Sequence, residues 1–305
     1  MQAINAIITQ LNQVILGKER QVSLALACLL AKGHLLLEDL PGMGKTTLAQ
    51  ALAGVFDLQF RRLQFTSDLL PSDVTGGNVL DLKSSQMTLL PGPVFTQLLL
   101  ADELNRASPK AQSALLEAME EGQVSIDGQS HALPEPFFVI ATQNPQQQLG
   151  THPLPESQLD RFLFCISLGY PDPKRERELL RPDHVSGRNH AVQPMASLSQ
   201  LRQWQAQVQG QQLAEPVLDY IQALLAATRD PSQFRLGLSP RAGQALVRVA
   251  QAWSMLAGRE FVVVDDVQQV FVALASHRLQ PINSQSGAFA AQQLLQQVPS
   301  EPWAQ

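Results

Sequence analysis

The chain has 305 residues, of which 45% are hydrophobic, and its formal net charge at pH 7 is −5. This length exceeds one typical domain and the apolar fraction is ample for a buried core, so we expect two domains. The negative charge disfavours a protein that coats a nucleic-acid duplex, although a local basic channel in an oligomer stays open. No apolar run approaches the roughly 18 residues that span a bilayer, and residues 1–16 lack a basic start, which favours the cytoplasm.

A glycine-containing loop follows the first expected strand. From Leu35 the sequence reads LLLEDLPGMGKTTLAQ, in which three leucines precede a turn, a lysine and two threonines at the head of an expected helix. Backbone N–H groups of such a loop turn inward and the helix N-terminus adds positive potential, so the loop suits an oligophosphate. Lys45 would reach the β- and γ-phosphates, and Thr46 would hold Mg²⁺. The expected phosphate-binding residues are Pro41, Gly42, Met43, Gly44, Lys45, Thr46 and Thr47.

Asp39 departs from the strict pattern G-x-x-x-x-G-K-[ST], which has glycine at that position. Aspartate tolerates tight-turn conformations better than most residues, so the loop is expected to survive the exchange. From the sequence alone, Asp39→Gly should therefore leave nucleotide turnover intact or raise it.

Apolar runs alternate with helical or loop segments in the first half of the chain, which predicts an α/β domain with a parallel sheet. Residues 66–97 are too long and too rich in Gly and Pro for a simple connection, so we expect an insertion there with its own hairpin or helix. A helix is expected from Ser108 to Gly122, and a hairpin around Asp127-Gly128. The expected strands cover residues 34–37, 61–65, 98–101, 137–142 and 162–168.

The second half predicts helices. Residues 181–200 show no apolar periodicity and are interpreted as a connection between domains. We therefore expect an α/β domain at residues 1–185 and a smaller all-helical domain at 186–305. Its helices are expected near residues 201–208, 216–228, 240–256 and 265–277. In the glutamine-rich tail we expect a short docking helix near 291–298, with disorder as the alternative.

Two acids follow the third expected strand in the segment LLLADELNR. If Lys45 binds a nucleotide for hydrolysis, one acid should serve Mg²⁺ and the other should orient the attacking water, which gives these roles to Asp102 and Glu103. Asn144, after the fourth strand, could align the water or touch the γ-phosphate. An exposed acidic pair and an asparagine turn before Pro145 are the structural alternatives, and each is reasonable taken alone.

Other residues have plainer interpretations. Cys28 and Cys165 lack metal-ligand spacing and are expected to be buried packing residues. The pairs 61–62 and 174–175, each made of two basic residues, are explained by solvated faces.

Several motifs, taken in order, resemble the MoxR branch of the AAA+ ATPases. They are GHLLLEDLPGMGKT, QFTSDLLPSDVTGG, GPVFTQLLLADELNRASPKAQSALLEAMEEGQV, ATQNP, LPESQLDRF and LSPRA, and the segment GREFVVVDDVQQVFVALASHRL resembles the helical lid of that family. The resemblance covers nearly the whole chain. It implies a P-loop sheet domain of the AAA+ type followed by a helical lid.

The resemblance also implies roles for the candidate residues. Lys45 and Thr46 correspond to Walker A, Asp102 and Glu103 to Walker B, and Asn144 to sensor 1. These assignments make ATP and Mg²⁺ the expected cofactors.

Two arginines receive roles from the resemblance alone. Arg241 in LSPRA corresponds to sensor 2, which would reach the phosphates of its own chain, and Arg161 in LDRF corresponds to an arginine finger for a neighbouring subunit. A guanidinium suits both tasks because it is always charged and presents a fork of donors. The structural alternative for Arg161 is an ion pair with Asp160 or Glu156.

The resemblance implies an ATP-hydrolysing remodelling motor that forms a ring, often a hexamer. It also implies a partner with a von Willebrand factor type A domain and a client protein complex. Two other functions stay open: a nucleotide-dependent DNA motor or loader, which the missing basic field disfavours, and a switch that binds ATP without hydrolysing it.

Overall fold

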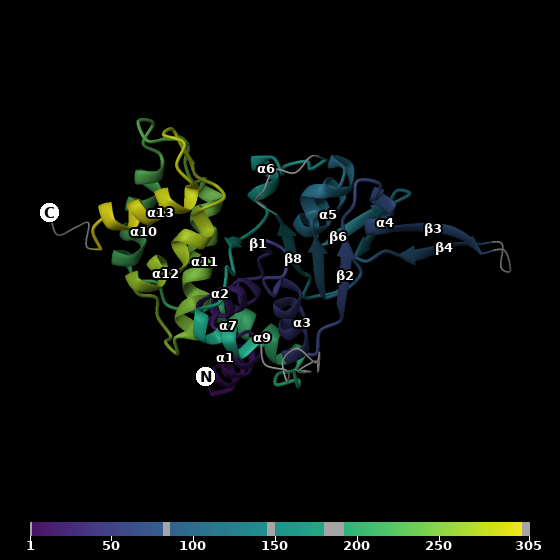
Figure 1. Cartoon of the computed structure of the whole chain (residues 1–305), viewed down its shortest axis with the longest axis horizontal. Coiled ribbons are helices and arrows are strands. Elements are labelled where there is room, and N and C mark those ends of the chain that lie inside the picture. Colours follow the sequence, from purple (N-terminus) through teal and green to yellow (C-terminus); the bar gives the residue numbers. More distant parts are fainter. Residues whose placement is uncertain (1, 82–85, 145–149, 180–191, 301–305) are drawn as a thin grey trace.

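The computed structural model describes residues 2–81, 86–144, 150–179 and 192–300 (Figure 1). Five parallel strands form the central sheet in the order β2-β5-β8-β1-β9, which confirms the predicted α/β class. Each strand begins within two residues of its predicted start. The strands are β1 (Leu35–Glu38), β2 (Phe60–Gln64), β5 (Leu98–Asp102), β8 (Phe138–Gln143) and β9 (Phe164–Ile166).

Alternate residues of the inner strands enter two hydrophobic clusters, one on each face of the sheet. Leu35 and Leu37 of β1 belong to the larger cluster, while Leu36 between them belongs to the smaller one. This alternation follows from the period of two along a strand, and explains why buried strands are apolar throughout. The larger cluster holds the helices α1 (Gln2–Val14), α2 (Glu19–Leu30) and α3 (Lys45–Val55); the smaller cluster holds α5 (Pro109–Glu121).

The predicted insertion forms a short helix and a hairpin. Helix α4 (Pro71–Thr75) leads into the antiparallel strands β3 (Gly76–Asp81) and β4 (Gln86–Pro91), and this hairpin extends away from the body of the molecule (Figure 1). The second hairpin, predicted at Asp127-Gly128, pairs β6 (Gln123–Ile126) with β7 (Gln129–Ala132). The amide Nδ2 of Asn78 donates to Asp127 at 2.8 Å and joins the two hairpins.

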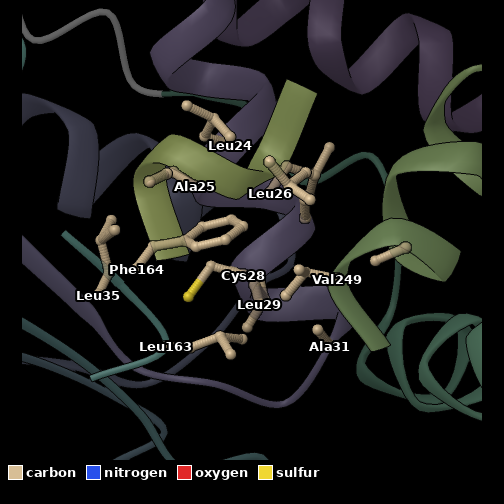
Figure 2. Packing of buried hydrophobic residues seen from close by; sticks show 14 of the residues in the cluster. Leu24, Ala25, Leu26, Cys28, Leu29, Ala31, Leu35, Leu163, Phe164 and Val249 are labelled. Atoms are coloured by element: carbon tan, nitrogen blue, oxygen red, sulfur yellow. The ribbon is translucent and has the colours of Figure 1, made fainter. Parts of the chain in front are cut away.

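The helical lid packs through the same hydrophobic cluster as α1, α2 and α3. Figure 2 shows side chains of α2 gathered with Leu35 and Phe164 of the sheet and Val249 of the lid. Cys28 is buried in this packing, and Cys165 is buried in the smaller cluster, as predicted. The helices are α9 (Leu198–Gln209), α10 (Glu215–Thr228), α11 (Pro240–Leu256), α12 (Val264–Ala275) and α13 (Gly287–Gln297).

One feature of the lid corrects the expectation that it is all-helical. A short antiparallel pair forms between β10 (Phe234–Leu236) and β11 (Gln280–Pro281), because the extended segments after α10 and after α12 lie side by side. The bulk of Phe234 is buried there, so the pair closes one edge of the lid core.

Several short elements complete the chain: the 3₁₀ helix η1 (Leu104–Arg106), α6 (Glu156–Leu159) and α7 (Pro173–Leu179). Most of the expected connection at 181–200 lies outside the described residues, so the boundary between domains stays a prediction. Helix α9, which that boundary assigns to the lid, packs Trp204 against Phe56 of the sheet domain with ring centroids 6.3 Å apart. Among the described residues no helix has the length and hydrophobicity needed to cross a membrane.

Candidate functional site

A cavity of about 400 Å³ opens at the carboxyl ends of the strands. Residues that end β1, β5 and β8 meet there with the loop that begins α3, because the carboxyl ends of parallel strands share one edge of the sheet. The cavity is lined by Asp39, Pro41, Gly42, Gly44, Lys45, Thr46, Thr47, Arg62, Gln64, Asp102, Glu103, Thr142 and Asn144.

The glycine loop has the conformation that its sequence predicts. Gly42 and Gly44 have φ angles of 84° and 87°, a region that residues with a Cβ rarely adopt. Gly44 directly precedes α3, so the first N–H groups of that helix face the cavity end of the loop. Met43 alone among the predicted loop residues turns away, and packs against the larger hydrophobic cluster.

Asp39 has a defined structural role that its sequence position did not indicate. Its buried carboxylate accepts hydrogen bonds from the Ser167 hydroxyl at 2.8 Å, the Leu168 N–H at 2.5 Å and the Gly169 N–H at 3.0 Å. These three donors tie the start of the phosphate loop to the end of β9. A glycine would leave the Leu168 N–H buried without its partner, so the expectation that Asp39→Gly is harmless does not fit the structure.

Lys45 lies across the loop. Its ammonium donates to the backbone oxygen of Asp39 at 2.7 Å. Burial lowers the pKa of Lys45, and the negative charge of three nearby carboxylates opposes that shift. The carboxylates belong to Asp39, Asp102 and Glu103. A cation that is partly withdrawn from water interacts strongly with a polyanion, so a phosphate chain with bound Mg²⁺ would interact favourably with Lys45 in this cavity.

The acidic pair sits where β5 ends. Asp102 accepts from the Thr142 hydroxyl and from the Arg62 guanidinium, both at 2.6 Å. Glu103 follows in the left-handed region, with φ 55°, which turns its side chain away from the direction of the strand. Its Oε2 accepts from Gln64 at 2.9 Å and from Arg106 at 2.8 Å. The two carboxylates are therefore held separately, each by its own donors.

Arg62, Gln64 and Thr142 are site residues that the sequence analysis missed. The interpretation of residues 61–62 as a solvated face is incomplete for Arg62: its side chain is 50% exposed, but it also forms an ion pair with Asp102. Gln64 lies opposite Asp102 in the register of β2 and β5, which aims it at the acids. A polar residue inside an apolar strand, as Thr142 is, was the one available signal.

The two predicted arginines do not line this cavity. Arg161 and Arg241 both form ion pairs with Glu120, at 2.9 Å and 3.0 Å, so neither alternative partner expected for Arg161 is correct. They line a second cavity with His34, the residue before β1, at the amino ends of the strands. The four residues of β1 separate the two cavities by about 13 Å. Arg241 is therefore not near the phosphate loop of its own chain, where the resemblance predicts it.

Comparisons with known proteins agree with this geometry. Residues 34–164 match the ATPase family associated with various cellular activities (AAA), and residues 226–298 match the AAA lid domain. The uncharacterised protein YeaC of Bacillus subtilis is 44% identical over 89% of this chain and 85% of its own length. Chaperone MoxR1 of Mycobacterium tuberculosis is 38% identical over 89% of this chain and 74% of its own length.

A solved structure from Cytophaga hutchinsonii, described as that of a candidate ATPase, superposes with a TM-score of 0.89 at 35% identity. The superposition covers 98% of this chain and 94% of that one, so sheet domain and lid are arranged alike in both. With the phosphate loop, the acidic pair and the lid in place, the chain belongs to the MoxR family of AAA+ ATPases.

Proposed function

We propose that this chain hydrolyses ATP in the cavity at the carboxyl edge of the sheet. One observation supports this most: a glycine loop with a lysine, a threonine and two separately held acids line a single cavity although they come from different elements. Phosphoryl transfer needs little covalent chemistry from a protein, and depends on positioning and on charges around the γ-phosphate. The residues of this cavity are of the kinds that supply both.

The donors in the cavity fit Mg²⁺. The Thr46 hydroxyl and the Asp102 carboxylate line the same space, and Mg²⁺ prefers such oxygen ligands while it keeps several waters. When bound, Mg²⁺ would supply positive charge that offsets the charge developing on the phosphates. Arg62 and Thr142 already fix the orientation of Asp102, so the carboxylate can serve the ion through a bound water without moving.

Glu103 is the proposed general base. Its Oε2 is oriented by Gln64 and Arg106, while its second carboxylate oxygen is available to accept a proton from the attacking water. Asn144 lines the same cavity and would help to align that water. Lys45 would leave the backbone oxygen of Asp39 for the β- and γ-phosphates.

Arg161 and Arg241 are proposed to act on the nucleotide of an adjacent copy. Both lie on the edge of the sheet opposite their own phosphate loop, and Glu120 holds both guanidinium groups on one carboxylate. A closed ring of copies would bring this edge against the open cavity of the next subunit. The role of Arg241 on its own chain is thereby replaced by a role shared with Arg161.

ATP hydrolysis is proposed to drive the mechanical remodelling of a protein complex. MoxR1 is named a chaperone, which supports a remodelling activity for a chain 38% identical to it. We propose a homo-oligomeric ring, a hexamer by family resemblance, acting in the cytoplasm with a partner that carries a von Willebrand factor type A domain. The described part of the chain offers no observation that favours DNA as the substrate.

The test separates the two acids. Glu103→Gln should keep ATP and Mg²⁺ bound while hydrolysis slows by about a hundredfold or more, the usual scale for a lost base. Asp102→Asn should in addition weaken nucleotide affinity, and its activity should need more Mg²⁺. Steady-state turnover and calorimetric titration, each over a Mg²⁺ series, measure both effects. Equal defects in the two variants would refute the division of roles.

A further inference from the structure

The second cavity, of about 230 Å³, is rich in basic side chains and lies between the lid and the sheet domain. Three of its arginines belong to one connected network. Arg241 of α11 binds Glu120 of α5, which also binds Arg161. Asp160, next to Arg161, binds Arg278, which lies three residues after the end of α12. Two lid arginines, Arg241 and Arg278, therefore connect to the sheet domain at either end of this network.

Arg278 makes the most hydrogen bonds in this network. Its Nε donates to Asp160 Oδ1 at 2.7 Å. Its Nη2 donates to the backbone oxygens of Asp160 at 3.0 Å and Phe162 at 2.7 Å, and its Nη1 donates to that of Leu163 at 3.2 Å. A further bond from Nη1 to the Leu274 oxygen fixes the guanidinium to the last turn of α12. The acceptors on the sheet domain flank Arg161 on both sides.

The guanidinium is almost fully withdrawn from water. The side chain of Arg278 is 7% exposed, and burial lowers its pKa while Asp160 opposes the shift. A buried charge is tolerated only where its donors are satisfied, so the backbone of residues 160–163 is held in one arrangement. His277 beside it keeps a neutral ring, because burial and the Arg278 charge lower the pKa of His277 well below its usual value.

We propose that Arg278 is a positioning residue for Arg161: it clamps residues 160–163 to the lid and so directs the Arg161 guanidinium toward the nucleotide of an adjacent copy. This inference rests on the proposed function, in which Arg161 serves a neighbouring site. In this arrangement the lid, through Arg278, holds the Arg161 guanidinium in the position that the neighbouring site needs. A change at Arg278 should damage the next subunit's site and leave the site of its own chain able to work.

The test uses Arg278→Lys, because lysine keeps the charge and lacks the planar fork that reaches several carbonyls at once. Calorimetric ATP affinity should be unchanged, while kcat falls about ten- to hundredfold, the scale for a catalytic group that is misplaced by about 1 Å. Arg259→Lys is the matched control. Arg259 is also a lid arginine and forms an ion pair with a buried acid, Asp266, but it makes no contact with residues 160–163. The kcat of Arg259→Lys should therefore stay near the wild-type value.

Mixed rings distinguish positioning from a merely structural role. A subunit with Arg278→Lys has an intact base, and a subunit with Glu103→Gln has an intact Arg161, so mixing the two should raise turnover above the average of the parents. Asp160→Asn removes the negative charge opposite Arg278 but keeps one acceptor oxygen, so it should show a smaller defect and the same rescue. Arg161→Ala mixed with Glu103→Gln is run in parallel, with subunit exchange followed by fluorescence transfer.

The outcomes separate the two proposals. Rescue of Arg161→Ala without rescue of Arg278→Lys or Asp160→Asn would overturn the positioning role and keep the shared site. Absence of rescue in all three mixtures would overturn the shared site, and the inference with it.

Discussion

Asp39 is the residue at which the structure changes the expectation most. Its carboxylate accepts three hydrogen bonds, two of them from backbone N–H groups that connect β9 to the phosphate loop. We predict that Asp39→Gly lowers the free energy of unfolding by about 2–4 kcal/mol, since it removes charged hydrogen bonds and leaves a buried donor unpaired. ATP affinity should fall as well, because the backbone oxygen that holds Lys45 is no longer fixed.

Urea unfolding and calorimetric titration check this prediction. Asp39→Asn keeps one acceptor oxygen, so its free energy of unfolding and its ATP affinity should lie between those of Asp39→Gly and wild type. Wild-type stability and ATP affinity in Asp39→Gly would contradict this prediction and support the expectation drawn from sequence alone.

His34 makes stability depend on pH. Its Nδ1 accepts from the Val139 N–H at 3.1 Å, while Nε2 lies 3.2 Å from the Met119 oxygen, so a neutral ring with the proton on Nε2 satisfies both. Burial lowers the pKa of His34 to about 4, below the value near 6.5 of an unfolded chain. The unfolded state therefore binds the proton first as the pH falls, and stability decreases between about pH 6.5 and pH 4.

From pH 7 to pH 5, His34 should lower the free energy of unfolding by at most about 2 kcal/mol. Urea unfolding at both pH values measures the change. In His34→Gln, which cannot take up this proton, the decrease should be smaller by that amount. An equally steep decrease in the variant would assign the acid sensitivity to other groups.

Single residues were predictable where their backbone or charge is special. Gly42, Gly44 and Lys45 carry a motif whose spacing follows from the loop itself. Arg62 and Glu120 were missed because their importance depends on which strand ends and helix ends meet, and a single sequence does not give that distance. At position 39 the sequence showed that aspartate replaces the glycine of the strict motif, but not the three hydrogen-bond donors that hold its carboxylate.

At the scale of elements, the hairpin β3–β4 depends on glycines at its base. A Cβ on Gly92 would lie 2.5 Å from the Val74 oxygen and as close to the Thr75 carbonyl carbon, both backbone atoms that cannot move aside. A Cβ on Gly77 would meet nothing within 4 Å. We predict that Gly92→Ala destabilises the protein by about 1–3 kcal/mol, the usual cost of overpacking, and that Gly77→Ala changes little.

Urea unfolding of the two glycine variants gives the comparison, and hydrogen exchange of the β3 amides locates the effect. Loss of protection in β3 and β4 is expected for Gly92→Ala only. Equal behaviour of the two variants would show that the base of the hairpin can adjust.

Strands and helices were predictable where the spacing of their apolar residues follows a single period. The leucine runs of β1 and β5 and the helical periodicity of apolar residues in α11 and α12 predicted strands and helices close to their observed bounds. Helix α1 was missed although Ile4, Ile7 and Leu11 show a helical spacing that its buried face confirms. The pair β10–β11 could not be predicted, because two short segments pair only after the lid helices have brought them together.

At the scale of the whole molecule, the sheet carries two groups of charged residues at opposite ends of its strands. The carboxyl edge carries the phosphate loop and the acids, whereas the amino edge carries Arg161, Arg241 and Glu120 beside the lid. Neither edge alone has the full set of charges that phosphoryl transfer uses. The sequence predicted most members of both sets but not Arg62 or Glu120. Only the fold shows that the two sets lie at opposite edges of the sheet, which is why we propose that a ring of copies completes the site.

ATP hydrolysis in the cavity that Lys45 lines is the central proposal for this protein. The direct measurement is steady-state ATP turnover and calorimetric ATP binding for wild type, Lys45→Ala and Lys110→Ala, the last a matched change at an exposed lysine of α5. We predict that Lys45→Ala loses ATP binding and turnover, because it removes the lysine proposed to bind the β- and γ-phosphates, while Lys110→Ala behaves as wild type. Normal ATP binding by Lys45→Ala, or a wild-type chain that does not hydrolyse ATP, would contradict it.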